Sequence, residues 1–312
     1  MSSTADPKER YTVANRLGVY KGPGETAAVD SFQAWLNRPQ VDATDYIDPS
    51  WNQSWNVYAL KYWGDWRRAR SGRQVVLGVH LVPKDTGTLT AGNNGAYDAQ
   101  YTQMGEMIRA NGLCGSVIRL GYEPNNPGIG PWNGTQNAAG YKSMYQRAHG
   151  LLKAKCPTLR FDYNCAVGPS GQASSFDALY PGNAYVDIVG LNIYDVWWQH
   201  PGVTAAQRWA NTLTTSMGVN DFKAFAASKG KPYSFPEWGL YAPGDDYEGG
   251  GDNPYFIDRM AELTAGSEYH AYFDLDWGGG VLDDFPNGKA KFKERFGDKS
   301  LYVSTKVRPK RR

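Results

Sequence analysis

The chain has 312 residues, of which 41% are hydrophobic and 14% aromatic, and it carries a net charge of +2. It can bury a large core, as one large domain or two ordinary ones. No run approaches the roughly 18 apolar residues of a membrane-spanning helix, and the polar start MSSTADPKERYTVANR lacks the apolar core of a secretory signal, so we expect neither a membrane span nor export by that route.

Short apolar, β-branched or aromatic runs recur along the chain and predict eight strands. They cover residues 16–22, 41–48, 74–82, 115–123, 159–167, 186–195, 232–239 and 268–277. Their starts are spaced by about 36 residues, the length of a strand-loop-helix-loop unit. The strands are apolar throughout rather than alternating, which favours a parallel sheet covered by helices.

The segments between these strands have apolar residues at three- and four-residue spacings, which is typical of amphipathic helices. The clearest helices are expected at 27–38, 97–112, 138–155 and 253–266. Eight such units within residues 1–300 most simply close into one α/β domain, a (β/α)8 TIM barrel. A doubly wound open sheet is the alternative, but GVYKGPGET at the first strand lacks the glycine spacing of a phosphate-binding turn.

Two segments lie outside the regular units, and we expect one to be a loop and the other a terminal tail. The glycine-rich stretch 243–254 follows the seventh strand, where a long active-site loop would lie. Residues 301–312 are predicted to form a basic C-terminal tail, because KVRPKRR ends the chain. We interpret this tail as a solvated terminus, with a virion or self-assembly contact as the alternative. Nothing else in the sequence suggests binding to nucleic acid, and we expect none.

Cysteine and histidine are sparse and scattered. The three cysteines have no CxxC spacing and the four histidines do not cluster, so we expect neither a metal nor a cofactor. Cys114 and Cys156 immediately precede the fourth and fifth strands on neighbouring units, and a disulfide between them is a hypothesis. His80 and His270, on the third and eighth strands, are interpreted as interior residues rather than catalytic ones.

Two glutamates stand at the carboxyl ends of the fourth and seventh strands, Glu123 and Glu237. In such barrels the carboxyl ends of all strands meet at one mouth, which holds the catalytic groups. A pair of carboxyl groups is what sugar hydrolysis needs: one protonated to donate to the leaving oxygen, one ionised to attack or steady the anomeric carbon. Nearby, Arg119 can hold an ionised partner and Tyr194 can donate a hydrogen bond, so the two pKa values can be pushed apart.

Tryptophan residues gather at the same strand ends. Flat apolar rings suit the C–H faces of sugars, and five of the eleven tryptophans fall just after strands four, six, seven and eight. They are Trp132, Trp197, Trp198, Trp238 and Trp277. The alternative interpretation is that most tryptophans are core residues, and we accept it for those in the helical segments.

At these residues the sequence resembles the glycoside hydrolases of clan A, and within it the β-mannanase-like family 26. That family has an Arg four residues before its acid/base Glu, an Asn two residues after it, and then a tryptophan. Arg119, Glu123, Asn125 and Trp132 match this pattern. PGNAYVDIVGLNIYD at 181–195 and the KP…EWG motif at 231–239 match its sixth and seventh strands, and GVYKG with FQAWLNRP matches its first repeat.

The resemblance implies retaining hydrolysis, with Glu123 as acid/base and Glu237 as nucleophile. It further implies that Tyr194 positions the nucleophile and that the Trp277 ring packs beneath the bound sugar. This chain departs from the family pattern at two positions that, in the family, contact the substrate or the nucleophile. Tyr122 stands where family 26 usually has His, and Asn192 stands where it has Asp. The expected substrate-binding or supporting residues are therefore Arg119, Tyr122, Asn125, Trp132, Asn192, Tyr194, Trp197, Trp238 and Trp277.

The leading hypothesis is a retaining O-glycoside hydrolase that acts on a polysaccharide, either a cell-envelope or a mannan-like glycan, by double displacement with two glutamates. The alternative is a barrel that binds a poly- or oligosaccharide without cleaving it, such as a phage tail or receptor-binding protein, which would reach an extracellular glycan without a secretory signal. A third hypothesis, a barrel enzyme of phosphorylated or aldehyde substrates, would want a strand-end lysine that the sequence lacks.

Overall fold

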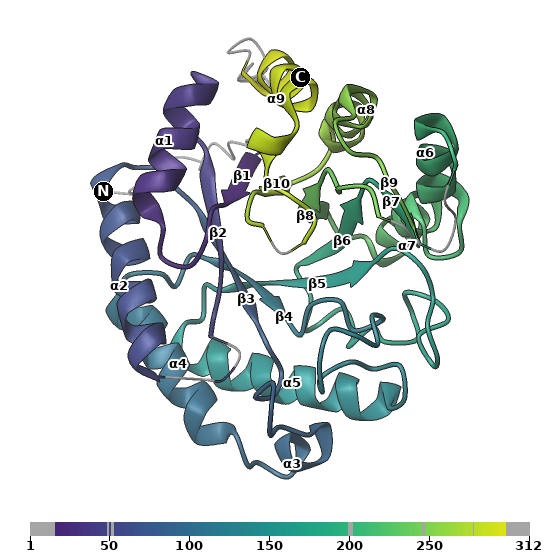
Figure 1. Cartoon of the computed structure of the whole chain (residues 1–312). Helices are drawn as coiled ribbons and strands as arrows, with labels where there is room; N and C mark the ends of the chain where they lie inside the picture. The colour runs from purple at the N-terminus through teal and green to yellow at the C-terminus, as the bar shows by residue number, and fades with distance from the viewer. Residues whose placement is uncertain are drawn as a thin grey trace, which may run out of the picture.

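The computed structural model describes residues 16–48, 50, 53–198, 202–244, 247–276 and 278–297. Eight parallel strands form a closed barrel in the order β1-β10-β8-β6-β5-β4-β3-β2 (Figure 1). The strands are β1 (Arg16–Tyr20), β2 (Asp42–Tyr46), β3 (Val75–Val79), β4 (Val117–Leu120), β5 (Arg160–Ala166), β6 (Ile188–Tyr194), β8 (Tyr233–Gly239) and β10 (Tyr269–Phe273). The barrel closes where β1 pairs with β10, with Arg16 opposite Tyr269. All eight strands predicted from the sequence are present, which confirms the TIM barrel.

Helices surround the barrel. They are α1 (Thr26–Leu36), α2 (Gln53–Ala69), α3 (Leu89–Asn93), α4 (Asp98–Ala110), α5 (Ala138–Lys155), α6 (Ala205–Thr214), α7 (Val219–Lys229), α8 (Pro254–Thr264) and α9 (Pro286–Phe296), with a short 3-10 turn at Leu282–Asp284. The four helices predicted most clearly correspond to α1, α4, α5 and α8. Between β5 and β6, residues 167–187 form turns instead of a helix, so this unit departs from the regular pattern.

Local sequence signals set several helix ends. The Thr204 side chain accepts from the backbone N–H of Gln207, whose own side chain reaches back, so a capping box starts α6. Asn253 caps α8, with Pro254 in the first turn. Gly230 ends α7 with a φ of 63°, a left-handed conformation that glycine adopts without strain.

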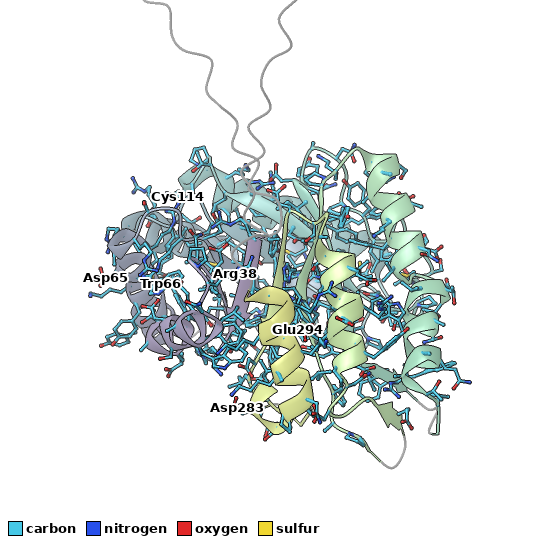
Figure 2. All side chains as sticks on the ribbon, turned by 90° about the horizontal axis from the view of Figure 1, so that it is seen from above. Arg38, Asp65, Trp66, Cys114, Asp283 and Glu294 are labelled. Carbon is cyan, nitrogen blue, oxygen red and sulfur yellow. A yellow bond between two sulfur atoms is a disulfide. The ribbon has the colours of Figure 1, made fainter. Side chains whose placement is uncertain are left out.

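The first and last helices complete the outer ring. α9 lies beside α1 (Figure 1), and Arg38, which follows α1, donates from Nη1 to the carbonyl of Phe296 at 2.7 Å. Arg38 is buried, and it supplies a cation at the C-terminal end of α9, where a helix exposes unpaired carbonyls. Side chains fill the space between the helices and the barrel in the view from above (Figure 2).

The disulfide hypothesis is confirmed. Cys114 and Cys156 are bonded across a sequence separation of 42, with their Cα atoms 5.0 Å apart. They precede β4 and β5, so the bond lies at the amino ends of the strands, opposite the expected catalytic mouth. Cys165 is a free, buried cysteine.

One expectation concerns residues outside the described ranges. The proposed tail at 301–312, with its boundary at residue 300, stays a prediction because residues 298–312 are not described. No helix in the described ranges combines the length and apolar character needed to cross a membrane.

Candidate active site

A cleft of about 790 Å³ opens at the carboxyl ends of the strands. Its walls come from most of the barrel strands and from the loops that follow them. Both Glu123 and Glu237 line it. The strand ends therefore bring together the two carboxyl groups that lie 114 positions apart in the sequence, as the barrel predicts.

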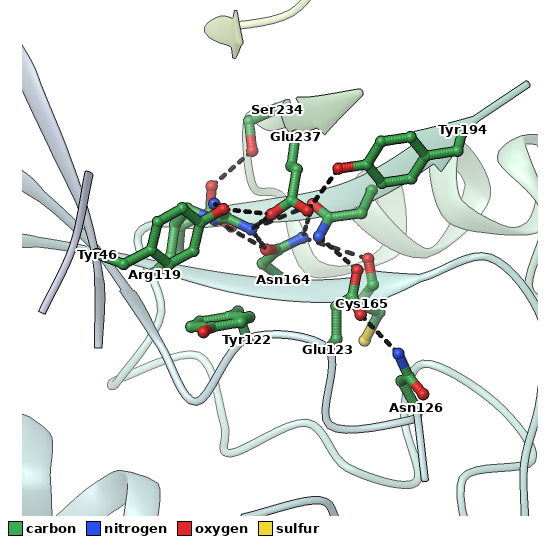
Figure 3. Close-up of polar contacts among 12 residues, drawn as sticks. Tyr46, Arg119, Tyr122, Glu123, Asn126, Asn164, Cys165, Tyr194, Ser234 and Glu237 are labelled. Carbon is green, nitrogen blue, oxygen red and sulfur yellow. Dashed lines mark hydrogen bonds and ion pairs between the residues drawn. The ribbon is translucent and has the colours of Figure 1, made fainter. Parts of the chain in front are cut away.

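Glu237, on β8, is held by three donors (Figure 3). Its Oε2 accepts from Arg119 Nη2 at 2.6 Å and from the Tyr46 hydroxyl at 2.5 Å. Its Oε1 accepts from the Tyr194 hydroxyl at 2.8 Å. A guanidinium and two phenols are strong donors to a carboxylate, and they hold Glu237 in one orientation.

Arg119, on β4, is itself rigid. Its side chain is fully buried, and Nε and Nη2 donate to the Asn164 side-chain oxygen at 2.9 and 2.7 Å. Nη1 donates to the Tyr46 hydroxyl at 2.7 Å, and the guanidinium lies 5.2–5.3 Å from the ring centres of Tyr46 and Tyr122. A buried charge needs such complete pairing, so this arginine supports the site from beneath.

The rings of Tyr46 and Tyr122 lie edge to face, with centroids 5.3 Å apart. Gly78 on β3 makes room for them, because a Cβ there would lie 2.5 Å from the Tyr46 ring and 3.3 Å from the Tyr122 ring. The small residue on β3 thus lets two large phenols stand side by side under the cleft.

Glu123 has a different environment. It is 8% exposed, and both of its oxygens accept from neutral amides: Oε1 from Asn192 Nδ2 at 2.7 Å and Oε2 from Asn126 Nδ2 at 2.8 Å. Burial raises the pKa of Glu123, and the negative charge of Glu237 raises this pKa further. The residue has a φ of 51°, which for a non-glycine residue costs roughly 1 kcal/mol, and its N–H bonds the Asn164 carbonyl at 2.6 Å.

The two carboxyl groups are therefore unequal. Glu237 has a cation and two phenols as donors, whereas Glu123 is buried beside amides and a neighbouring negative charge. The raised pKa of Glu123 suits a proton donor, and the charge-paired Glu237 suits a nucleophile, the two roles that acid-assisted displacement at an acetal carbon requires.

Most of the residues predicted from the sequence lie at this cleft. Besides the two glutamates, the lining includes Tyr122, Trp132, Asn192, Tyr194 and Trp197.

Asn125 does not line the cleft. Its Nδ2 donates to the carbonyls of Ala166 and Gly168 at 2.8 and 2.6 Å, and its Oδ1 accepts from the Ala166 N–H at 2.9 Å. It ties the loop after β4 to the end of β5, so its contribution to the site is indirect.

Trp238 requires a correction. It is fully buried and stacks on Phe292 at 5.8 Å, and its indole N–H donates to His270 Nδ1 at 3.2 Å. Adjacent residues of a strand point to opposite sides, so Glu237 and Trp238 cannot both face the mouth. Trp238 belongs to the layer between the barrel and α9, and His270 is the interior residue that was expected. Trp277 lies outside the described residues, and its role as the subsite floor stays a prediction.

His80 is more involved in the site than its interior interpretation indicates. It is 3% exposed, yet it lines the cleft, and its Nε2 is 2.7 Å from the Tyr122 hydroxyl. The Trp132 ring packs edge-on against it, with centroids 4.3 Å apart. Burial lowers the pKa of His80 to about 3, so it is a neutral partner that orients Tyr122.

Three residues of the site were missed from the sequence: Tyr46, Asn126 and Asn164. Tyr46 lies near the end of the second predicted strand, 41–48, and is the last residue of β2, so the strand-end rule applied to every strand would have found it. Asn164 is a polar residue within the fifth apolar strand, and a buried amide there signals a partner. Asn126 lies in a loop, and its contact with Glu123 leaves no pattern in the sequence.

β7 (Val196–Trp198) lines one wall of the cleft and pairs with β9 (Tyr247–Gly249) as a two-stranded antiparallel ribbon. β9 lies within the glycine-rich stretch 243–254 and pairs with β7, but no described residue of this stretch lines the cleft, so the active-site loop expected there stays a prediction. Trp198 lines the cleft and is 52% exposed. Within the described part of the chain, no group of three or more His, Cys, Asp or Glu is arranged to hold a metal ion.

No known family model matches the chain. A curated mannan endo-1,4-beta-mannosidase from Bifidobacterium adolescentis is 26% identical over 203 residues, which cover 59% of this chain and 20% of that protein. The match thus spans about a fifth of that relative's length.

Solved structures are similar over nearly the whole chain. A ruminal GH26 endo-beta-1,4-mannanase matches with a TM-score of 0.63 and 14% identity, covering 93% of this chain and 64% of that one. The Cellulomonas fimi endo-beta-1,4-mannanase double mutant matches with a TM-score of 0.65 and 14% identity, covering 93% of this chain and 72% of that one. A GH26 beta-mannanase from Bacteroides ovatus matches with a TM-score of 0.64 and 12% identity, covering 95% of this chain and 94% of that one. At this identity the likeness to solved structures concerns the fold. Together with the curated match, it identifies the chain as a barrel similar to the glycoside hydrolases of family 26, the resemblance carried by its strand-end motifs.

Proposed function

We propose that the chain is a retaining glycoside hydrolase of a β-linked, mannan-like polysaccharide, with Glu237 as nucleophile and Glu123 as acid/base. One observation carries the proposal: Glu237 accepts from Arg119, Tyr46 and Tyr194, whereas among the described residues the side chain of Glu123 accepts from amides alone and has a raised pKa. The substrate class comes from the relatives, which are named as mannanases or a mannan mannosidase.

In the first step the Glu237 carboxylate attacks the anomeric carbon, and the bond from that carbon to the leaving oxygen breaks. Glu123 gives its proton to the leaving oxygen, so an alcohol departs and a glycosyl ester of Glu237 remains. Arg119, Tyr46 and Tyr194 hold the nucleophile where it can attack.

In the second step Glu123 acts as a base. Esterification removes the negative charge of Glu237, which is one cause of the raised pKa of Glu123, so that pKa falls when a base is needed. Glu123 takes a proton from water, the water attacks the anomeric carbon, and the ester bond to Glu237 breaks. Two displacements leave the configuration unchanged.

The test uses soluble β-1,4-mannan and glucomannan with the wild-type chain, Glu237→Gln and Glu123→Gln. Each variant should lose at least about 1,000-fold in kcat/KM on the polymer. Glu106→Gln is the matched control, because Glu106 is a surface residue paired with Lys155. It should keep full activity.

Proton NMR of the fresh hydrolysate decides the stereochemistry, since a retaining enzyme releases the β anomer before mutarotation. Release of the α anomer first would contradict double displacement. Binding of mannan with no release of reducing ends would overturn the proposal in favour of a glycan-binding barrel.

A further inference from the structure

An unbroken series of hydrogen bonds connects the two carboxyl groups. Arg119 Nη2 donates to Glu237 at 2.6 Å and to Asn164 Oδ1 at 2.7 Å. Asn164 Nδ2 donates to Asn192 Oδ1 at 2.9 Å, and Asn192 Nδ2 donates to Glu123 Oε1 at 2.7 Å. Figure 3 draws these contacts as dashed lines, with Arg119, Asn164, Glu237 and Glu123 labelled.

The chemistry of Arg119 fixes the direction of every bond in this series. A guanidinium only donates, so Asn164 must turn its side-chain oxygen toward Arg119 and its NH₂ group toward Asn192. Asn192 must then accept with its oxygen, which leaves its NH₂ group facing Glu123. Asn164 and Asn192 are 0% and 3% exposed, so packing limits any other orientation.

We propose that Asn164 and Asn192 form an amide bridge that positions the acid/base Glu123, with its direction set by the guanidinium that also holds the nucleophile. The two asparagines are positioning residues, and the kinetic part of this inference rests on the proposed function. The bridge presents a neutral donor to Glu123 Oε1. It also gives a reason for asparagine at position 192, where the chain departs from the family motif.

A carboxylate at position 192 could not take this role. An ionised aspartate only accepts, so it would repel Glu123 and compete with Glu237 for Arg119. Only a shared proton would then allow residue 192 and Glu123 to stay in contact, and that would change the titration of both.

The first test measures the titration of Glu123 without any substrate. Glutamate labelled with ¹³C at the side-chain carboxyl is incorporated, and the Glu123 signal is assigned from its loss in Glu123→Gln. Asn192→Asp should move the Glu123 midpoint upward by at least about one pH unit, the effect of a close like charge. Asn211→Asp is the control, because Asn211 also lines the cleft but has no contact with Glu123 among the described residues. An equal shift in both variants, or none in Asn192→Asp, would overturn the bridge.

The second test separates positioning of the acid from general damage. Asn192→Ala should lower kcat/KM on the polymer by roughly 10- to 100-fold, the range expected when general acid catalysis is impaired. A 2,4-dinitrophenyl glycoside carries a leaving group that needs no proton, so kcat/KM for it should fall by less than about threefold. Equal losses on both substrates would mean a merely structural role.

A double mutant completes the design. If Asn192 acts through Glu123, Asn192→Ala should add less than about a twofold further loss in the Glu123→Gln background. Full additivity would contradict the bridge. Should the wild-type chain prove inactive, the proposed function fails while the NMR titration still decides whether Asn192 sets the state of Glu123.

Discussion

The donors around a glutamate decide what that glutamate can do, and Tyr46 shows this at the scale of a single residue. Its hydroxyl accepts from Arg119 and donates to Glu237, so it completes a triangle with the ion pair. Burial raises the pKa of Tyr46 well above its usual range, so the phenol stays protonated and remains a donor at any working pH.

Tyr46→Phe should therefore remove one donor from Glu237, the proposed nucleophile. One hydrogen bond to a charged group is worth about 1.5–3 kcal/mol, so kcat/KM should fall by roughly 10- to 150-fold. The free energy of unfolding should fall as well, because the buried Arg119 Nη1 loses this acceptor. Steady-state kinetics on β-mannan would measure this. Tyr58→Phe, at a tyrosine that is 60% exposed on α2, is the control and should have no effect. A wild-type rate for Tyr46→Phe would show that Arg119 and Tyr194 suffice.

A second residue-scale prediction concerns stability. Asp162 on β5 is fully buried, and its Oδ2 accepts from the hydroxyls of Ser234 and Tyr269 at 2.6 and 2.5 Å. Its Oδ1 has no partner among the described residues. Burial raises the pKa of Asp162 from 3.8 to about 6. Since the folded state favours the protonated form, its stability falls as the pH rises from about 4 through 6.

This shift in the pKa of Asp162 corresponds to a loss of about 3 kcal/mol from the free energy of unfolding, at 1.36 kcal/mol per pH unit. Urea unfolding at pH 4 and pH 7.5 should show that Asp162→Asn removes this part of the pH dependence. Any cost of an unpaired amide would be the same at both pH values. Asp85→Asn, at an exposed aspartate, is the control. An unchanged pH dependence in Asp162→Asn would contradict the prediction.

At the scale of elements, buried polar contacts hold the β7–β9 ribbon in place. Arg208 of α6 donates to Asp195 Oδ1 at 2.9 Å, and Asn253 before α8 donates to Asp195 Oδ2 at 2.6 Å. Arg208 also reaches Glu248 of β9 at 3.3 Å. Asp195 is 3% exposed, so its charge needs these partners. The loops that carry β7 and β9 are thereby fixed to the helices behind them, which allows Trp198 to form a firm part of the cleft wall.

Trp198→Ala should affect long substrates more than short ones. An exposed ring on the wall can bury apolar area against sugar units away from the cleaved bond, which is worth about 1–2 kcal/mol. KM for a mannohexaose should rise by roughly 5- to 30-fold, while kcat/KM for a short aryl glycoside should change little. Tyr62→Ala removes another exposed ring, one on α2 that does not line the cleft, and should change neither value. Equal losses on long and short substrates would place the effect of Trp198 at the reacting sugar.

At the scale of the whole molecule, stability and chemistry occupy opposite ends of the barrel. The disulfide between Cys114 and Cys156 lies before β4 and β5, whereas Glu123 and Glu237 lie after β4 and toward the end of β8. Barrels in general separate a stabilising amino-terminal face from a catalytic carboxyl-terminal face.

Replacing both cysteines by alanine should therefore reduce stability and spare the reaction. A cross-link over 42 positions contributes about 4 kcal/mol in the chain-entropy model. The free energy of unfolding should fall by that order, while kcat/KM stays within about twofold. The native protein should show no reactive thiol and the denatured, unreduced protein one, from the buried Cys165. Three thiols without a reductant would contradict the disulfide.

Much of this architecture could be predicted from the sequence, because strands and helices are encoded by local patterns. The apolar runs and their spacing predicted all eight barrel strands, and the strand-end rule placed both glutamates at one mouth. The prediction for Trp238 was wrong because its ring follows Glu237 directly in the strand and therefore points to the opposite side. Tyr46 stands at a strand end and follows the same strand-end rule, whereas Asn164 lies inside its strand and is recognisable only from its partners on other strands.

Periodicity and position within one unit are thus enough to predict the barrel, the two carboxyl groups and most of the residues around them. The donors that each carboxyl group receives cannot be predicted in this way, because they come from other strands. Glu237 obtains Arg119, Tyr46 and Tyr194 from three other strands, and Glu123 obtains Asn192 through a contact that Asn164 directs. The physical reason is that hydrogen bonds and pKa shifts depend on distances of about 3 Å between side chains far apart in the chain, which become fixed only when the barrel closes.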